Sequence, residues 1–261
     1  MIKRNVAVAL IALLLAANVS RAELVKKQID YKQGDATLKG YLVYDDAKTG
    51  KRPGVVVVPE WWGLTDYPRH RADMLAELGY VAFAADIYGN GETTTDPKRA
   101  GELAGKFRGD RELLRTRVQA AVDELKKQEQ ADSDKLAAIG YCFGGTAVLE
   151  AARTGAPLKG VVSFHGGLDF PQPPHEGQIK AKVLVLTGDA DPMVPPEQVK
   201  KFEQEMKNVG ADVKIERYPD AVHAFTNPNA DKVGIKGIGY NKEADEKSWQ
   251  AMKQFFEQNL K

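Results

Sequence analysis

The sequence contains little cysteine or histidine and has almost no net charge. Cys142 is the single cysteine, so no disulfide can form within one chain, and its thiol stays reactive, lies buried or pairs between chains. Lys and Arg number 37 against 36 Asp and Glu, and the net charge of +1 gives no indication of nucleic acid or an anionic membrane as a partner. One Cys and four scattered His show none of the usual ligand spacings, so no metal site is expected.

The amino-terminal apolar run is too short to be a typical transmembrane helix. It spans Val6–Ala17, below the ~20 residues that cross a bilayer, and two basic residues precede it. Ser20-Arg21-Ala22 then places small residues where a signal peptidase reads. This layout predicts a secretory signal peptide over residues 1–22, with an uncleaved membrane anchor as the alternative. We expect residues 23–261 to be periplasmic or secreted, without stable membrane association after signal removal, and monomeric.

Strand-like and helix-like segments alternate through the rest of the chain. The expected strands are 37–44, 55–58, 81–85, 135–139, 160–164, 183–187 and 213–218. The expected helices are 66–78, two within 97–130 that break near Gly109-Asp110, 145–152, 196–209 and 243–259. Short β-branched runs are typical of strands covered on both faces. The pattern predicts a single α/β domain over 23–261, with a mostly parallel central sheet flanked by helices on both faces.

The single cysteine lies in a turn of a recognisable kind. Gly140-Tyr-Cys142-Phe-Gly144 follows a strand-like run and precedes a helix-like one. This is the Gly-x-nucleophile-x-Gly pattern, in which a strained strand-to-helix elbow raises a nucleophile above the edge of a parallel sheet. The alternative is a small buried cysteine in a Gly-rich turn.

Two later loops offer an acid and a histidine. The loop after strand 183–187 holds Asp189 and Asp191, and the loop after strand 213–218 holds His223. Ligands gather beyond the carboxyl ends of the strands in such sheets, and the order nucleophile, acid, histidine is that of a hydrolase triad. His223 would exchange a proton with the thiol, and either aspartate could orient it. His165, which also follows a strand, is expected to line the pocket instead.

The loop after strand 55–58 completes the expected site. Pro59-Glu60-Trp61-Trp62-Gly63 occupies the place that supplies one backbone N–H to an oxyanion hole, and the residue after the nucleophile supplies the other. These donors are the backbone of Trp61 and of Phe143. Glu60 would lie near the thiol, and as a carboxylate at a buried strand end it needs a partner, for which Arg69 and Arg71 are alternatives.

Taken together, these motifs resemble those of the dienelactone hydrolase family of α/β-hydrolases. The resemblance rests on an ordered set that spans most of the chain after residue 22: Pro59–Gly63, Asp86-Ile-Tyr88-Gly, Gly140–Gly145, Gly188–Pro195, His223-Ala-Phe225 and Tyr240-Asn241. It implies Cys142, Asp191 and His223 as the triad. It also implies that Glu60 contacts the resting thiol and moves when substrate binds. The family cleaves esters and lactones through an acyl-enzyme, without a cofactor.

The sequence departs from this family where the substrate is held. The dienelactone-cleaving members bind a substrate carboxylate with two arginines, and the corresponding stretches here contain Asn90 and Asn227. Because asparagine cannot copy a bidentate arginine–carboxylate pair, an uncharged or differently shaped ester is expected. The residues expected to line the pocket are Trp62, Tyr88, Asn90, His165, Phe225 and Asn227.

The predicted function is hydrolysis of a small-molecule carboxylic ester or lactone by a Cys-His-Asp triad. The main alternative is a non-catalytic ligand-binding protein on a hydrolase scaffold, since an exported cysteine nucleophile is vulnerable to oxidation. Cleavage of short peptides is a weaker alternative, because amide bonds demand more of the acid that protonates the leaving group.

Overall fold

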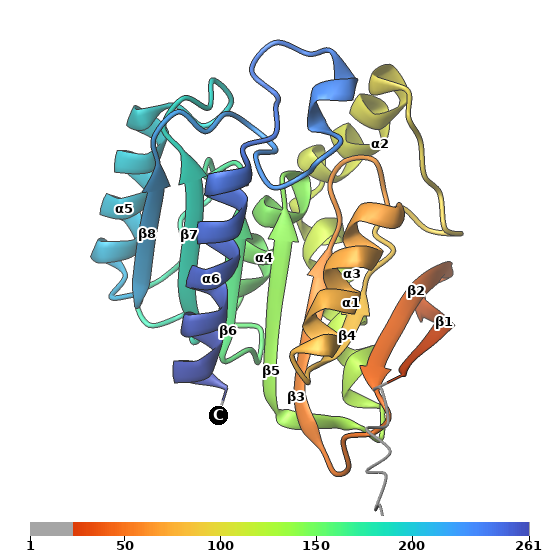
Figure 1. Ribbon diagram of the computed structural model, residues 1–261. Helices are drawn as coiled ribbons and strands as arrows, with labels where there is room; N and C mark the ends of the chain where they lie inside the picture. The colour runs from red at the N-terminus through yellow and green to blue at the C-terminus, as the bar shows by residue number, and fades with distance from the viewer. Residues whose placement is uncertain (1–22, 261) are drawn as a thin grey trace, which may run out of the picture.

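The computed structural model describes residues 23–260, which fold around one eight-stranded sheet (Figure 1). The strand order is β1-β2-β4-β3-β5-β6-β7-β8. The strands are β1 (Leu24–Gln33), β2 (Ala36–Asp45), β3 (Arg52–Val58), β4 (Val81–Ala84), β5 (Ala131–Tyr141), β6 (Gly160–Phe164), β7 (Lys182–Gly188) and β8 (Val213–Tyr218). β1 and β2 pair antiparallel, as do β2 and β4, and the remaining pairs are parallel. The prediction of a mostly parallel central sheet is confirmed.

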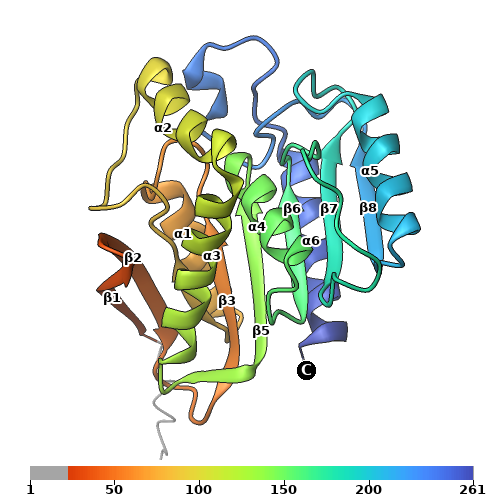
Figure 2. The same cartoon turned by 180° about the vertical axis from the view of Figure 1, so that it is seen from behind.

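Helices cover both faces of the sheet (Figures 1 and 2). The helices are α1 (Asp66–Glu77), α2 (Pro97–Gly109), α3 (Arg111–Lys126), α4 (Phe143–Arg153), α5 (Pro196–Asn208) and α6 (Lys242–Asn259). Apolar residues of α1 and α6, such as Leu75 and Phe256, share one buried cluster with one face of the strands. Residues of α3, α4 and α5, such as Val118 and Phe202, form the cluster on the opposite face. Burial on both faces explains the unbroken apolar runs of the central strands.

The structure adds elements that the sequence pattern did not indicate. β1 forms a hairpin with β2 through a turn at Gly34, whose φ of 56° is favoured by glycine. Only Tyr31 of β1 is fully buried, so this edge strand carries little of the alternation that marks a half-buried strand. β5 begins at Ala131, four residues before the predicted 135–139, through a polar stretch that pairs with the start of β3.

Parallel strands bring distant loops to one edge of the molecule. β3, β5, β7 and β8 all point the same way, so the loops that follow them meet beyond their carboxyl ends. This edge is uppermost in Figure 1, where the segment after β8 crosses above the sheet before α6 begins. Among residues 23–260, no helix has the length and apolarity needed to span a membrane.

Candidate active site

Cys142 occupies the elbow between β5 and α4 in a strained conformation. Its φ of 53° lies in the left-handed region that side chains other than glycine rarely adopt. A Cβ on Gly140 would collide with the backbone of Gly144, and one on Gly144 would collide with the carbonyl of Val58. The two glycines therefore allow β5, α4 and the end of β3 to approach closely enough to hold the thiol at the sheet edge.

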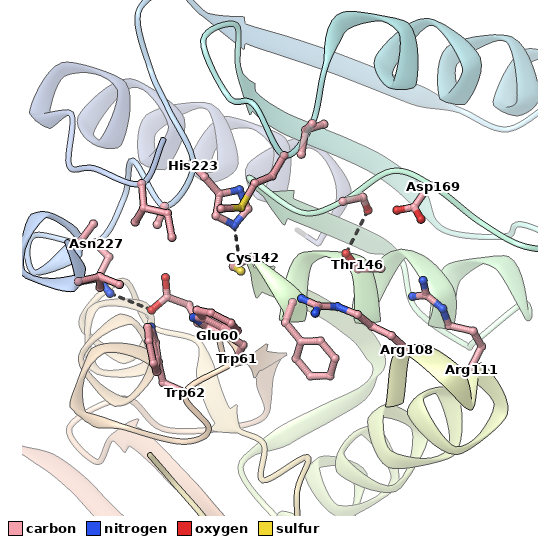
Figure 3. Close-up of a pocket in the computed structure, with 18 residues that line it drawn as sticks. Glu60, Trp61, Trp62, Arg108, Arg111, Cys142, Thr146, Asp169, His223 and Asn227 are labelled. Carbon is pink, nitrogen blue, oxygen red and sulfur yellow. Dashed lines mark hydrogen bonds between the residues drawn. The ribbon is translucent and has the colours of Figure 1, made fainter. Parts of the chain in front are cut away.

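His223 joins Cys142 to Asp191. Its Nε2 lies 3.0 Å from the Cys142 Sγ (Figure 3), and its Nδ1 lies 2.8 Å from the Asp191 Oδ2. Asp191 and His223 are almost fully buried, at 2% and 5% exposed. The second carboxylate oxygen of Asp191 accepts a hydrogen bond from the Met193 N–H, which fixes its rotation. Asp189, left open by the sequence pattern, instead pairs with Arg217 at 2.5 Å on the surface.

The surroundings of His223 favour its charged form. Burial alone would lower its pKa, but the neighbouring Cys142 sulfur and the hydrogen-bonded Asp191 carboxylate raise the pKa to about 10. An imidazolium next to the sulfur can stabilise a thiolate, which is the nucleophilic form of cysteine. The arrangement therefore has the three parts that a thiol nucleophile requires: a sulfur, a proton-exchanging histidine and an orienting carboxylate.

His165 lies behind the nucleophile rather than on the pocket surface. It is fully buried, its Nδ1 accepts the Cys142 N–H at 3.1 Å, and its Nε2 lies 2.7 Å from the Thr226 Oγ1. Burial lowers its pKa well below the usual value, and the nearby His223 and Arg71 charges lower it further. A neutral ring that accepts at Nδ1 carries its proton on Nε2 and donates it to Thr226. The expectation that His165 lines the pocket is therefore wrong, since this ring supports the elbow from below.

The support of the elbow extends to α1 and α6. The Thr226 hydroxyl lies 2.6 Å from the Tyr67 hydroxyl, which accepts a hydrogen bond from Arg71. Arg71 also donates to the Thr226 carbonyl and forms an ion pair with Asp245 of α6. The loop that carries His223 is thus tied to both helices on one face of the sheet by buried hydrogen bonds.

Glu60 is buried at the end of β3 and partners Asn227. Its Oε2 accepts from the Asn227 Nδ2 at 2.8 Å, and the side chain is 3% exposed. Burial raises the pKa of Glu60 to about 7, although the Asn227 hydrogen bond and the His223 charge oppose this rise. Among the described residues no hydrogen bond joins Glu60 to Arg69, Arg71 or the thiol, although Glu60 and Cys142 line the same cavity.

The expected oxyanion-hole residues border the same cavity as the thiol. Trp61 and Phe143 both line the cavity, and in the described part of the chain their N–H groups have no hydrogen-bond partner. The Tyr88 hydroxyl donates to the Trp61 carbonyl at 2.7 Å, and the Tyr88 ring packs against the Phe143 ring. Tyr88 thus contacts both residues, although it is not among the residues that line the cavity.

Two further pocket expectations are corrected. Asn90 is exposed in a turn with φ of 54°, and its N–H donates to the Thr37 carbonyl away from the cavity. Phe225 is fully buried in the core, where its ring contacts those of Tyr218 and His165. The turn between the two residues, in which Ala224 has a φ of 58°, sets the direction of the Phe225 side chain. Trp62 and Asn227 line the cavity.

The cavity has a volume of about 350 Å³ and draws its lining from six segments (Figure 3). Sequence reasoning missed eleven of the lining residues: Arg108, Arg111, Thr146, Gly167, Asp169, Met193, Val194, Ala224, Ala230, Val233 and Ile238. The two arginines flank the α2–α3 break, which the sequence did indicate near Gly109-Asp110. The Asp110 side chain accepts from the Leu113 N–H and caps α3. The basic residues on both sides of the predicted break were the available signal for these two positions. The sequence did not show that their side chains point toward the site.

Within residues 23–260, no three His, Cys, Asp or Glu side chains are placed to hold a metal ion.

Comparison with known proteins places this geometry in context. The family model described as "Dienelactone hydrolase family" matches residues 38–260. A Yersinia pestis protein described as a carboxymethylenebutenolidase is 31% identical over 238 residues, which cover 87% of this chain and 85% of that protein. A Bradyrhizobium protein described as a "Probable 2-oxo-3-(5-oxofuran-2-ylidene)propanoate lactonase" is 32% identical over 188 residues, covering 68% of this chain and 75% of that one.

A solved structure shows the same architecture at higher identity. It is described as a dienelactone hydrolase-like promiscuous phosphotriesterase from metagenomic libraries. It superposes with a TM-score of 0.88 at 40% identity, and the match covers 92% of this chain and all of the other.

Proposed function

The chain belongs to the dienelactone hydrolase family and is a hydrolase of ester or lactone bonds, and we propose that Cys142, His223 and Asp191 form its catalytic triad. The observation that carries the proposal is the continuous line from the Asp191 carboxylate through His223 to the Cys142 sulfur, at 2.8 Å and 3.0 Å. It ends at a cavity of about 350 Å³, large enough for a small ester.

In the first half of the proposed reaction, the Cys142 thiolate attacks the substrate carbonyl carbon. A sulfur–carbon bond forms, and the carbonyl electron pair moves to oxygen, which faces the N–H groups of Trp61 and Phe143. The tetrahedral intermediate collapses when the carbon–oxygen bond to the leaving alcohol breaks. His223 gives its Nε2 proton to that oxygen, and Asp191 holds the ring in the required orientation.

In the second half, water releases the acyl group. His223, now neutral, takes a proton from a water molecule as its oxygen attacks the thioester carbonyl. The sulfur–carbon bond breaks, the acid leaves and the thiolate–imidazolium pair is restored. A lactone follows the same path, with its alcohol and acid ends remaining on one product molecule.

The test compares the wild-type protein with Cys142→Ala on phenyl acetate and simple lactones. We expect turnover by the wild type and none by the variant, with circular dichroism confirming that both are folded. Substantial turnover by Cys142→Ala would refute the nucleophile. A non-catalytic binding protein would show no turnover, and its thiol would react with iodoacetamide no faster than a small reference thiol at neutral pH.

A second candidate substrate class is the phosphotriester. The relative described as a promiscuous phosphotriesterase favours it, because it is 40% identical over 92% of this chain. A thiolate that attacks phosphorus would form a sulfur–phosphorus bond as the phosphorus–oxygen bond to the leaving alcohol breaks, and His223 would give that oxygen its proton. Water, deprotonated by the neutral His223, would then attack phosphorus and break the sulfur–phosphorus bond, with the phosphoryl oxygen facing the same N–H groups in both steps. Release of 4-nitrophenol from diethyl 4-nitrophenyl phosphate by the wild type, and not by Cys142→Ala, is the expected result.

We also propose that residues 1–22, which lie outside the described residues, are a cleaved signal peptide. The protein would then act in the periplasm or outside the cell as a single domain and a monomer. Amino-terminal sequencing of protein from fractionated cells should begin at Glu23, and light scattering should give the mass of one chain. Retention of residue 1 in a membrane fraction would instead indicate an anchor.

A further inference from the structure

Two apolar side chains line the cavity from the loops on either side of β8. Met193 belongs to the loop after β7, and Ile238 belongs to the loop after β8. Met193 is 43% exposed, and within residues 23–260 only Leu78 is another large apolar side chain that is exposed to this extent. Leu78 ends α1 outside the cavity lining. Met193 instead faces the cavity, where an apolar part of a ligand could cover it.

The Asp191 carboxylate places Met193 next to His223. Its Oδ2 lies 2.8 Å from the His223 Nδ1, and its Oδ1 accepts the Met193 N–H at 2.8 Å. Two oxygens of one carboxylate therefore hold the histidine ring and the backbone of Met193. The Val194 N–H also donates to the Asp191 carbonyl at 3.3 Å, which closes the turn. This turn fixes the backbone of Met193 beside the histidine.

Backbone pairing places Ile238 beside the same histidine. The His223 N–H donates to the Gly237 carbonyl at 3.0 Å, and Ile238 pairs with His223 as in a parallel sheet. A Cβ on Gly237 would collide with the Pro192 ring, so the loops after β7 and β8 are in close contact there. Met193 and Ile238 therefore come from two loops that meet next to His223.

The alcohol portion of a substrate would begin at this histidine. In the proposed reaction His223 gives its Nε2 proton to the leaving oxygen, so that oxygen lies within hydrogen-bond distance of Nε2. The carbonyl oxygen faces the N–H groups of Trp61 and Phe143 instead. The carbon atoms attached to the leaving oxygen thus extend along the part of the wall that holds Met193 and Ile238.

Polar lining residues elsewhere in the cavity leave this part of the wall apolar. Glu60 and Asn227 are hydrogen-bonded to each other at 2.8 Å. Figure 3 shows the Arg108 and Arg111 side chains well to one side of His223. A polar group on the alcohol portion would lose hydrogen bonds to water at an apolar wall, whereas an apolar group gains by leaving water.

We propose that Met193 and Ile238 form an apolar subsite for the alcohol portion of the substrate. The inference rests on the proposed function and narrows the substrate to an ester with an alkyl or aryl group on the leaving oxygen. In a lactone, the corresponding part is the ring carbon next to the ring oxygen, together with its apolar substituent.

The experiment lengthens the two ends of an ester separately. Ethyl, propyl and butyl acetate extend the alcohol portion, and ethyl acetate, propanoate and butanoate extend the acyl portion. The acetates all give the same acetyl-enzyme, so their kcat/KM values compare the alcohol portions. We expect kcat/KM of the wild type to rise about three- to fourfold for each methylene added to the alcohol portion. 2-Methoxyethyl acetate, of the same length as butyl acetate, should be the poorer substrate of the two.

Variants assign the preference to the two side chains. Met193→Ala and Met193→Gln both keep the N–H that bonds Asp191, and each should at least halve the gain from ethyl to butyl acetate. The ratios within the acyl series should stay as in the wild type. Ile238→Val should act in the same direction with a smaller effect, because it removes one methylene. Leu78→Ala is the matched control, an equally exposed apolar side chain outside the cavity, and should leave both series unchanged.

The outcomes separate failure of the subsite from failure of the proposed function. A wild-type acetate series without a rise, an unchanged gain in both Met193 variants, or equal changes in the two series would overturn the subsite while ester hydrolysis stands. If the wild type hydrolyses none of these esters, phenyl acetate and the lactones decide the proposed function.

The subsite is then tested by alkylation of Cys142, the single cysteine, with iodoacetamide. Hexan-1-ol should slow the alkylation of the wild type. Met193→Ala should need at least about threefold more hexan-1-ol for the same protection, because part of the apolar contact is lost. Absence of protection in the wild type, or equal protection of the two proteins, would overturn the subsite.

Discussion

The two sides of the cavity around Cys142 are built in opposite ways. On the paired side, which comprises Asp191, His223, His165 and Thr226 behind the thiol, each of these side chains has a short hydrogen bond within the protein. On the arginine side, formed by Arg108, Arg111 and Asp169, polar groups face the cavity with few internal partners. The first side is buried under the loop after β8, and the second borders the break between α2 and α3.

This difference separates two tasks that one pocket must perform. Groups that exchange protons need fixed geometry, and hydrogen bonds from a second layer provide it. Groups that recognise a substrate must keep donors free until the substrate arrives, since a donor already satisfied inside the protein gains little from a ligand. Substitutions on the paired side should therefore impair all substrates alike, and substitutions on the arginine side should change which substrates are preferred.

The largest effect is expected from Asp191→Asn on the paired side. An amide at this position would present its NH₂ group to His223 and favour the wrong tautomer, while Oδ1 could still accept from Met193. We expect kcat to fall about 10³-fold or more for charged and neutral esters alike. Steady-state kinetics on a charged ester and its neutral analogue, such as 4-acetoxybenzoate and 4-acetoxybenzamide, measure this loss of kcat. Asp189→Asn is the matched control and should change kcat less than about twofold, since Asp189 lies on the surface with Arg217; a larger loss there would reopen the choice of acid.

A pH-dependent effect is expected at Glu60. Its pKa of about 7 in the folded protein lies above the usual value of 4.5, so the folded state binds this proton more tightly than the unfolded chain. Protonated Glu60 therefore stabilises the folded state fully below about pH 4.5, and this contribution is lost as the pH rises through 7. Glu60→Gln keeps a neutral partner for Asn227. We expect its stability relative to the wild type to rise by about 2 to 3 kcal/mol between pH 5 and pH 8.

Urea unfolding at the two pH values measures this difference. Glu77→Gln, at an exposed position on α1, is the control and should show the same difference from the wild type at both. If the stability difference between Glu60→Gln and the wild type is the same at pH 5 and pH 8, the pKa of Glu60 is not raised in the folded protein.

Two buried threonines test the hydrogen bonding of the paired side directly. Thr226→Val removes the hydroxyl that joins His165 to Tyr67, and it should cost about 1 to 3 kcal/mol because both partners lose a buried hydrogen bond. Thr187, at the end of β7, is equally buried, but its hydroxyl has no partner in the described part of the chain. Thr187→Val should therefore be neutral or slightly stabilising. Equal losses in the two variants would show that the network does not stabilise the elbow.

The same contrast explains how far sequence reasoning reached. Cys142, Asp191 and His223 follow strands, and parallel strands must bring their carboxyl ends together, so chain order sufficed to group them. The places of His165 and Phe225 depend on side-chain direction within a loop, which strand order does not determine. Tyr88 and Asn90 depend on the turn after β4 in the same way. The arginine side was missed because packing sets the direction in which the side chains beside a helix break point. Only the break itself could be predicted from Gly109-Asp110.

The smallest effect is expected from Asp169→Asn, and it sharpens the contrast from the arginine side. Asp169 lies on the same side of the cavity as Arg108 and Arg111 (Figure 3), so removing its charge should make that side more positive and strengthen the attraction for a negatively charged ester. Because Asp169 is exposed and screened by water, we expect only a two- to threefold rise, on the order of 0.5 kcal/mol, in the preference for the charged ester. Glu176→Gln, in the same loop but outside the lining, should leave the preference unchanged. A fall in preference on losing Asp169 would mean that this carboxylate orients an arginine rather than competing with the substrate for it.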